Sequence, residues 1–111
     1  MNSISFVLES NCYNISGNNL AVDSILSGAN TKLVDNSPEK CSQFCEKSNF
    51  AYAGVQYNKC FCGNQMPSAS QRSFGCYSVC PGDNLEQCGG FTVMNVYKVK
   101  GMMNYSLRQY I

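Results

Sequence analysis

The apolar positions near the middle of the chain follow a helical period. Cys41, Phe44 and Cys45 are spaced i, i+3 and i+4, so they fall on one stripe of a helix. Ser37 is a favourable N-cap in front of this stripe, and the remaining positions are mostly polar. The pattern predicts a helix over residues 38–47 whose cysteine-bearing stripe is covered by another element.

After the predicted helix, the sequence changes to patterns that are typical of strands. Residues 50–56 and 60–62 predict the two strands of a hairpin, with a turn at Asn58 and Lys59. Residues 91–99 alternate regularly and predict a last strand inside the sheet. The helix, the hairpin and the last strand are therefore the expected framework of the fold.

The other segments are predicted from their turn-forming residues. Residues 17–36 are loop-like, because Asn, Gly and Ser interrupt two short apolar runs. Cys76 and Cys80 repeat the one-turn spacing, which predicts a second short helical turn that Pro81 ends. Residues 83–90 are expected to form a turn-rich link to the last strand.

The cysteine count indicates that this framework is cross-linked. Eight cysteines in 111 residues, an even number, indicate disulfides formed in an oxidising compartment. Side chains alternate along a strand, so the two cysteines of the hairpin share one face and are expected to meet the helical stripe. We therefore expect two bridges that join Cys41 and Cys45 to Cys60 and Cys62. The pairing stays open for Cys12, Cys76, Cys80 and Cys88.

The charge pattern favours an uncharged polar ligand. Eight basic and seven acidic residues give a net charge of +1 without any run of lysine or arginine, so nucleic acid is not an expected partner. No apolar run is long enough for a transmembrane segment. The opening residues lack a basic region and a full apolar stretch, so we expect either a signal peptide already removed or an excerpt of a longer chain. Glycosylation sequons begin at Asn14 and Asn104.

Catalysis is not expected from this composition. The chain has no histidine, so neither a Ser-His-Asp nor a Cys-His arrangement can form. The acidic pairs Asp35 with Glu39 and Asp83 with Glu86 fit a helix start and a turn better than acid–base catalysis. Four thiolates could bind zinc in a reduced protein, but the cysteine spacings fit disulfides better. No metal and no cofactor are therefore expected.

Aromatic and amide side chains of the hairpin are the candidate binding residues. Aromatic rings can stack on sugar faces while amides bond to hydroxyl groups. If the small residues of the first strand pack under the helix, Tyr52, Gln56 and Phe61 lie on the opposite face, and Gly54 leaves a flat gap there. The alternative is that the two rings form a second layer of a small core. The predicted carbohydrate-binding set is Tyr52, Gln56, Tyr57, Asn58, Lys59, Phe61 and Asn64.

The order of the cysteine motifs resembles that of a known family. The chain contains CSQFC, then FAYAGVQYNKCFCGN, then CYSVC, PGDNLEQCGG and the closing VMNVY. This order is similar to that of WSC domains, the cysteine-rich modules of fungal cell-wall stress sensors and of Kremen and polycystin ectodomains. The resemblance covers residues 10–99, and all eight cysteines fall in the family's positions. It implies an α+β fold, a twisted antiparallel sheet crossed by one helix of the PAN/apple-like kind, with four disulfides.

The resemblance also implies an organisation and a function. Residues 10–100 are expected to form the domain, residues 1–9 a leader or edge segment, and residues 101–111 a tail or linker. The implied function is non-catalytic binding of a cell-wall or matrix polysaccharide, such as a β-glucan, outside the cell or at its surface. The alternative is a protein-binding ectodomain of a cell-surface receptor, in which the same exposed aromatic residues contact a protein.

Overall fold

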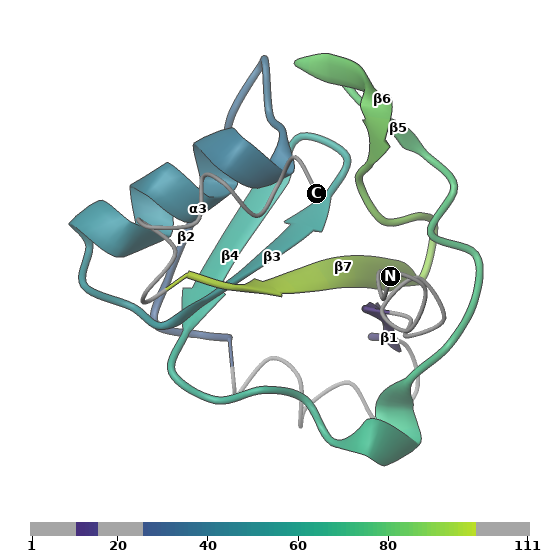
Figure 1. Cartoon of the computed structure of the whole chain (residues 1–111), viewed down its shortest axis with the longest axis horizontal. Coiled ribbons are helices and arrows are strands. Elements are labelled where there is room, and N and C mark those ends of the chain that lie inside the picture. The colour runs from purple at the N-terminus through teal and green to yellow at the C-terminus, as the bar shows by residue number, and fades with distance from the viewer. Residues whose placement is uncertain (1–10, 16–25, 100–111) are drawn as a thin grey trace, which may run out of the picture.

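The computed structural model describes residues 11–15 and 26–99, which fold into one α-helix, one short 3-10 helix and two antiparallel sheets. The expected leader and tail, residues 1–9 and 101–111, lie outside the described residues. Figure 1 shows the elements, which are, in chain order, β1 (Cys12–Asn14), β2 (Ala29–Lys32), α3 (Pro38–Lys47), β3 (Tyr52–Gln56), β4 (Lys59–Gly63), η1 (Ala69–Gln71), β5 (Val79–Cys80), β6 (Asp83–Gln87) and β7 (Val93–Lys98).

The helix α3 begins after the predicted N-cap and ends before a residue in the left-handed region. Ser37 Oγ accepts a hydrogen bond from Lys40 N at 3.1 Å, and Pro38 occupies the first turn, where its missing N–H would have no helical partner. Asn49 follows the helix with φ at 70°, a left-handed conformation that asparagine tolerates. The predicted helix over residues 38–47 is confirmed.

Five strands form the larger sheet, in the order β1-β7-β3-β4-β2. The predicted hairpin is confirmed as β3 and β4, and the predicted last strand, β7, lies inside the sheet between β1 and β3. The predicted position of the hairpin turn is wrong by one residue. Gln56 pairs with Lys59, so the turn consists of Tyr57 and Asn58, and Lys59 already belongs to β4.

The segment after Cys76 differs from the prediction. Val79 and Cys80 form β5, which pairs with β6 in a separate two-stranded sheet, so the predicted helical turn is wrong and most of the expected link is a strand. The reason is the bridge from Cys80 to Cys88, whose Cα atoms lie 4.9 Å apart at a sequence separation of 8. So short a closed loop favours two extended segments that run back along each other.

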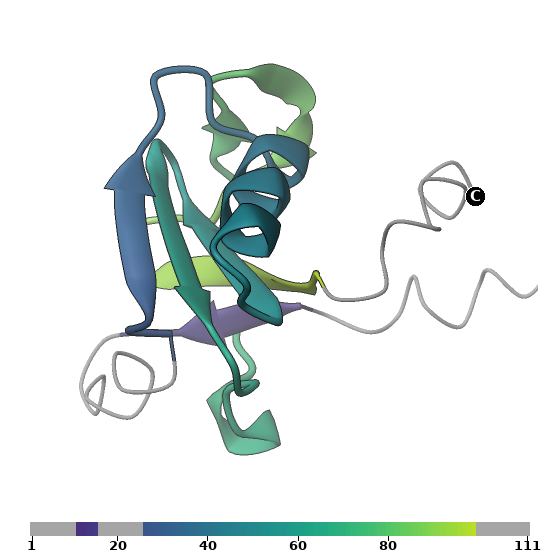
Figure 2. The ribbon, with the colours of Figure 1, turned by 90° about the vertical axis from the view of Figure 1, so that its left-hand side faces the viewer.

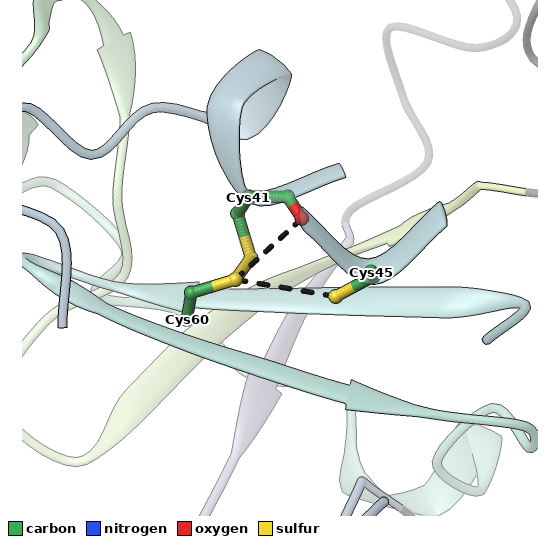
Figure 3. Close-up of side chains that lie close together, drawn as sticks. All are labelled: Cys41, Cys45 and Cys60. Atoms are coloured by element: carbon green, nitrogen blue, oxygen red, sulfur yellow. Dashed lines mark hydrogen bonds between the residues drawn. A yellow bond between two sulfur atoms is a disulfide. The ribbon is translucent and has the colours of Figure 1, made fainter. Parts of the chain in front are cut away.

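Two disulfides join α3 to the hairpin, and Figure 3 shows the first of them. The bonds are Cys41 to Cys60 and Cys45 to Cys62, which confirms the predicted set of four cysteines and resolves its pairing. Cys45 Sγ lies 3.9 Å from Cys60 Sγ, so the two bridges pack side by side. The bridges that the sequence left open are Cys12–Cys76 and Cys80–Cys88.

The sheet buries apolar side chains on both of its faces. Figure 2 shows α3 on one side of β2, β3 and β4, and there the four cysteines of the two bridges pack with Ala53, Val55 and Val99. Because side chains alternate along β3, β7 and β1, the other face carries a second, smaller core. This second core consists of Tyr13, Leu26, Met94 and Val96.

We expect the two helix-to-hairpin bridges to be energetically redundant. Their sequence separations are 19 and 17, so they close nearly the same loop. Removing one bridge leaves the loop closed, whereas removing both releases a loop-closure entropy worth about 3 kcal/mol. The variants are the cysteine-to-alanine pairs at 41 and 60, at 45 and 62, and at all four positions, and guanidinium unfolding measures their free energies. The combined loss should exceed the sum of the single-bridge losses, and additive losses would contradict this account.

Candidate functional site

The face of the larger sheet away from α3 carries most of the predicted binding residues. Cys60 and Cys62 point toward the helix, so Lys59 and Phe61 point the other way, and the pairing of β3 with β4 places Gln56 beside Lys59. We call this face of Tyr52, Gln56, Lys59 and Phe61 the open face.

Tyr52 and Phe61 are only partly available for binding. Both rings are half-buried and pack against the second core. The flat gap expected at Gly54 is wrong, because a Cβ atom there would lie 2.5 Å from Met94 Sδ and 3.0 Å from Leu26 Cδ1. The two rings therefore pack in the second core and expose only part of their surface.

Tyr57 is the most exposed predicted aromatic residue and is held by its backbone. Its side chain is 53% exposed, and its φ of 51° lies in the left-handed region. Its N–H donates to Cys88 O at 2.7 Å, and its carbonyl oxygen accepts from Asn36 Nδ2 at 2.7 Å. The turn is thus fixed on both sides while the ring stays in contact with solvent.

Asn36 connects three segments at this turn, and no local sequence pattern indicates this role. Its fully buried side chain also donates to Lys59 O at 3.1 Å, and its own carbonyl oxygen accepts from Gly82 N. The residue stands just before the N-cap of α3. The side-chain amide of Asn36 therefore holds the hairpin, and its backbone carbonyl oxygen holds the β5–β6 turn next to the start of α3.

A loop that contains Gly89 and Phe91 lies against the same end of the hairpin. Gln56 Nε2 donates to Gly90 O at 3.0 Å and to Phe91 O at 3.1 Å. Gly89 has a φ of 68°, and a Cβ atom there would lie 2.8 Å from Val55 O, so a larger residue would not fit. The Phe91 side chain is 95% exposed, which places a second accessible ring on the loop that Gln56 holds.

The structure does not bring all predicted site residues together. Gln56, Tyr57, Asn58 and Lys59 gather at the hairpin turn. Asn64 follows the far end of β4, roughly 16 Å along the strand, and its Oδ1 accepts a hydrogen bond from Ala51 N. Asn64 therefore fixes the entry to β3 and is not part of the group at the turn.

Several exposed apolar side chains were missed by the sequence analysis. The pattern of apolar and polar positions did not indicate them, because the segments are short or irregular and the β5–β6 sheet was not expected. Val79 lies on β5 and Leu85 on β6, and the others lie in loops and are Val34, Phe74, Tyr77 and Phe91.

One ion pair and one buried tyrosine have shifted pKa values in the described part of the chain. Lys40 Nζ lies 2.6 Å from Asp35 Oδ2, and this hydrogen bond lowers the pKa of the carboxyl group and raises the pKa of the amine. Burial raises the pKa of Tyr97, whose ring packs against the core under α3. Neither feature belongs to the open face, and neither resembles a catalytic acid–base pair.

The cysteine cluster under α3 does not offer a metal site in the oxidised protein. The Sγ atoms of Cys41, Cys45 and Cys60 lie within 4.8 Å of one another, and Figure 3 draws the three side chains together. All three are committed to disulfides, so no thiolate is available as a ligand. Within residues 11–15 and 26–99, no helix is long and apolar enough to span a membrane.

One helix bridged to an antiparallel sheet, four disulfides and an exposed tyrosine at a hairpin turn define a small disulfide-rich α+β module. The sequence model of the WSC domain family matches residues 10–90, and the chain belongs to this family.

Related segments occur in proteins with different names. Xylosyltransferase oxt from Drosophila melanogaster is 44% identical over 68 residues, which are 59% of this chain and 8% of that protein. Kremen protein 1 from Mus musculus is 38% identical over 56 residues, which are 47% of this chain and 12% of that protein. A WSC domain-containing protein from Arthroderma benhamiae is 34% identical over 62 residues, 53% of this chain and 7% of that protein. The chain thus spans about a tenth of these relatives.

We expect Asn36→Ala to lower the free energy of unfolding by about 2 kcal/mol, because the carbonyl oxygens of Tyr57 and Lys59 lose their donor and a buried cavity forms. Urea unfolding measures this change. Asn84→Ala on the exposed strand β6 is the matched control, and its effect should stay within about 0.5 kcal/mol. Equal effects of the two substitutions would contradict the role assigned to Asn36.

Proposed function

We propose that this chain is a non-catalytic domain that binds cell-wall or matrix polysaccharide, such as a β-glucan, through the hairpin end of the open face. The observation that carries the proposal is Tyr57, an exposed ring on a turn whose backbone is fixed by two hydrogen bonds. A ring that is already ordered loses little conformational entropy when a sugar stacks on it.

The backbone of Tyr57 supports a role other than folding. Tyr57 is the first of the two residues in its hairpin turn and has a positive φ. In turns in which only this first residue has a positive φ, glycine is the preferred residue there. A tyrosine in the left-handed region costs on the order of 1 kcal/mol, and such strain concentrates at functional sites. The ring returns little of this cost through packing, because half of it remains exposed.

The neighbouring groups suit a hydroxyl-rich ligand. Asn58 and Lys59 follow Tyr57, and Gln56 precedes it, so amide and ammonium groups surround the ring. Partly exposed edges of Tyr52 and Phe61 extend the surface along the sheet. The site is shallow, so the affinity for one site should lie at about millimolar to micromolar dissociation constants.

The cell exterior is the proposed location. Four disulfides without a free cysteine in the chain require an oxidising compartment. Asn14, in β1, is a proposed glycosylation site within this setting, and the second sequon at Asn104 lies outside the described residues. The match to the xylosyltransferase spans only 8% of that protein, so transferase activity is not proposed for this chain.

A second candidate function is protein binding, as a module of a cell-surface receptor. It is favoured by the exposed apolar side chains of Tyr77, Val79 and Leu85 on the β5–β6 sheet and its approach, since apolar and aromatic residues form the centres of protein interfaces. Kremen protein 1 contains a related segment. This surface lies outside the open face, so substitutions can separate the two functions.

We expect Tyr57→Gly to remove polysaccharide binding without loss of stability. Glycine relieves the positive φ, so the free energy of unfolding should stay constant or rise by up to about 1 kcal/mol. Retention on insoluble β-glucan, chitin and xylan should fall at least about fivefold, because the stacking ring is lost.

Tyr77→Ala is the matched control, since it removes an exposed tyrosine ring outside the open face and should leave retention unchanged. Unchanged retention of Tyr57→Gly would overturn the assigned site. A failure of the natural chain to bind any polysaccharide, together with saturable binding of a protein that Tyr77→Ala abolishes, would favour the receptor function.

A further inference from the structure

Two lysines face each other across the edge of the open face. β2 is the edge strand beside β4 (Figure 1). The register of this strand pair places Lys32 directly opposite Lys59. Leu33 N donates to Asn58 O, and such a bond flanks a non-hydrogen-bonded pair in an antiparallel sheet. Lys32 and Lys59 form this non-hydrogen-bonded pair, in which the Cα atoms lie about 4.5 Å apart. Both side chains are exposed, and both point away from α3, because Thr31 and Cys60 point toward it.

The open face carries no acidic side chain in the part of the chain that the structure describes. Asp35 precedes α3 and is paired with Lys40, Glu39 and Glu46 lie on α3, and Asp83 and Glu86 lie on β6. Lys98 adds a third exposed cation to the open face, opposite Tyr52. The nearly neutral chain therefore has a locally positive surface next to its aromatic residues.

Like charges placed directly opposite each other on a sheet destabilise the free protein. An anion that lies between the two ammonium groups removes this repulsion and accepts hydrogen bonds from both. The polar row of Gln56, Lys59 and Lys32 runs across three strands and ends beside the Tyr57 turn. A sugar that stacks on Tyr57 would thus place its substituents near the lysine pair.

We propose that the open face prefers an acidic polysaccharide, with a carboxylate or sulfate group of the sugar bound between Lys32 and Lys59. This inference rests on the proposed function and specifies the chemical class of its ligand. A neutral glucan occupies the same aromatic site more weakly, because it leaves the repulsion between the lysines in place.

The test uses one glucan backbone with and without charge. Carboxymethylated β-glucan and the unmodified β-glucan are titrated onto the chain at low and at physiological ionic strength, and sulfated β-glucan is the second acidic arm. The carboxymethylated form should bind at least about fivefold more tightly at low salt, and the difference should shrink as salt screens the charges. Comparison of the two acidic arms distinguishes a carboxylate from a sulfate ligand.

Substitutions then locate the preference. Lys32→Gln should lower the affinity for the acidic glucan about threefold and leave the affinity for neutral glucan unchanged, and Lys59→Gln should lower the affinity for the acidic glucan by a similar factor. Lys47→Gln removes the same charge from α3, on the other side of the sheet, and should change neither affinity. Lys59→Glu should raise the unfolding midpoint by forming an ion pair with Lys32, and it should abolish the acidic preference.

Three results would overturn the inference. The first is equal affinity for the charged and uncharged glucans, which leaves the proposed function intact. The second is an acidic preference that Lys47→Gln reduces as much as Lys32→Gln. The third is equally tight binding of single-stranded DNA, which would show general attraction of polyanions. Binding of neither glucan would instead contradict the proposed function itself.

Discussion

The two disulfides between α3 and the β3–β4 hairpin are the constraint on which the rest of the structure depends. They fix a ten-residue helix, too short to be stable alone, against one face of the sheet. Once Cys60 and Cys62 point toward the helix, the alternation of β4 directs Lys59 and Phe61 to the other face. The position of every predicted binding residue on the hairpin follows from this one covalent arrangement.

In a small domain held by these two disulfides, some aromatic residues pack in the core and others lie at the surface. The open face needs a second apolar layer, and Tyr52 and Phe61 contribute to it while keeping exposed edges. Tyr57 lies at the hairpin turn, beyond the end of that layer, and more than half of its surface stays exposed. The proposed binding surface is therefore the rim of a core, and the polar row from Gln56 to Lys32 extends it toward the sheet edge.

The sequence predicted the helix, the hairpin and the helix-to-hairpin cysteines because these depend on local periodicity and capping. The sequence-based prediction misplaced the turn by one residue, because tyrosine is not a residue type that indicates a turn position with a positive φ. The β5–β6 sheet was missed because the bridge from Cys80 to Cys88 overrides the helical spacing of Cys76 and Cys80. Asn36 and the opposed lysines depend on contacts between distant segments, which no local pattern encodes.

Mapping the disulfides of the oxidised protein tests the central claim most directly. Cleavage at Phe44, Lys59 and Phe61, with the protein denatured and not reduced, places the four helix and hairpin cysteines in separate peptides. The account predicts that mass spectrometry finds Cys41 linked to Cys60 and Cys45 linked to Cys62. The exchanged pairs, Cys41 with Cys62 and Cys45 with Cys60, or a bridge within the helix, would contradict it.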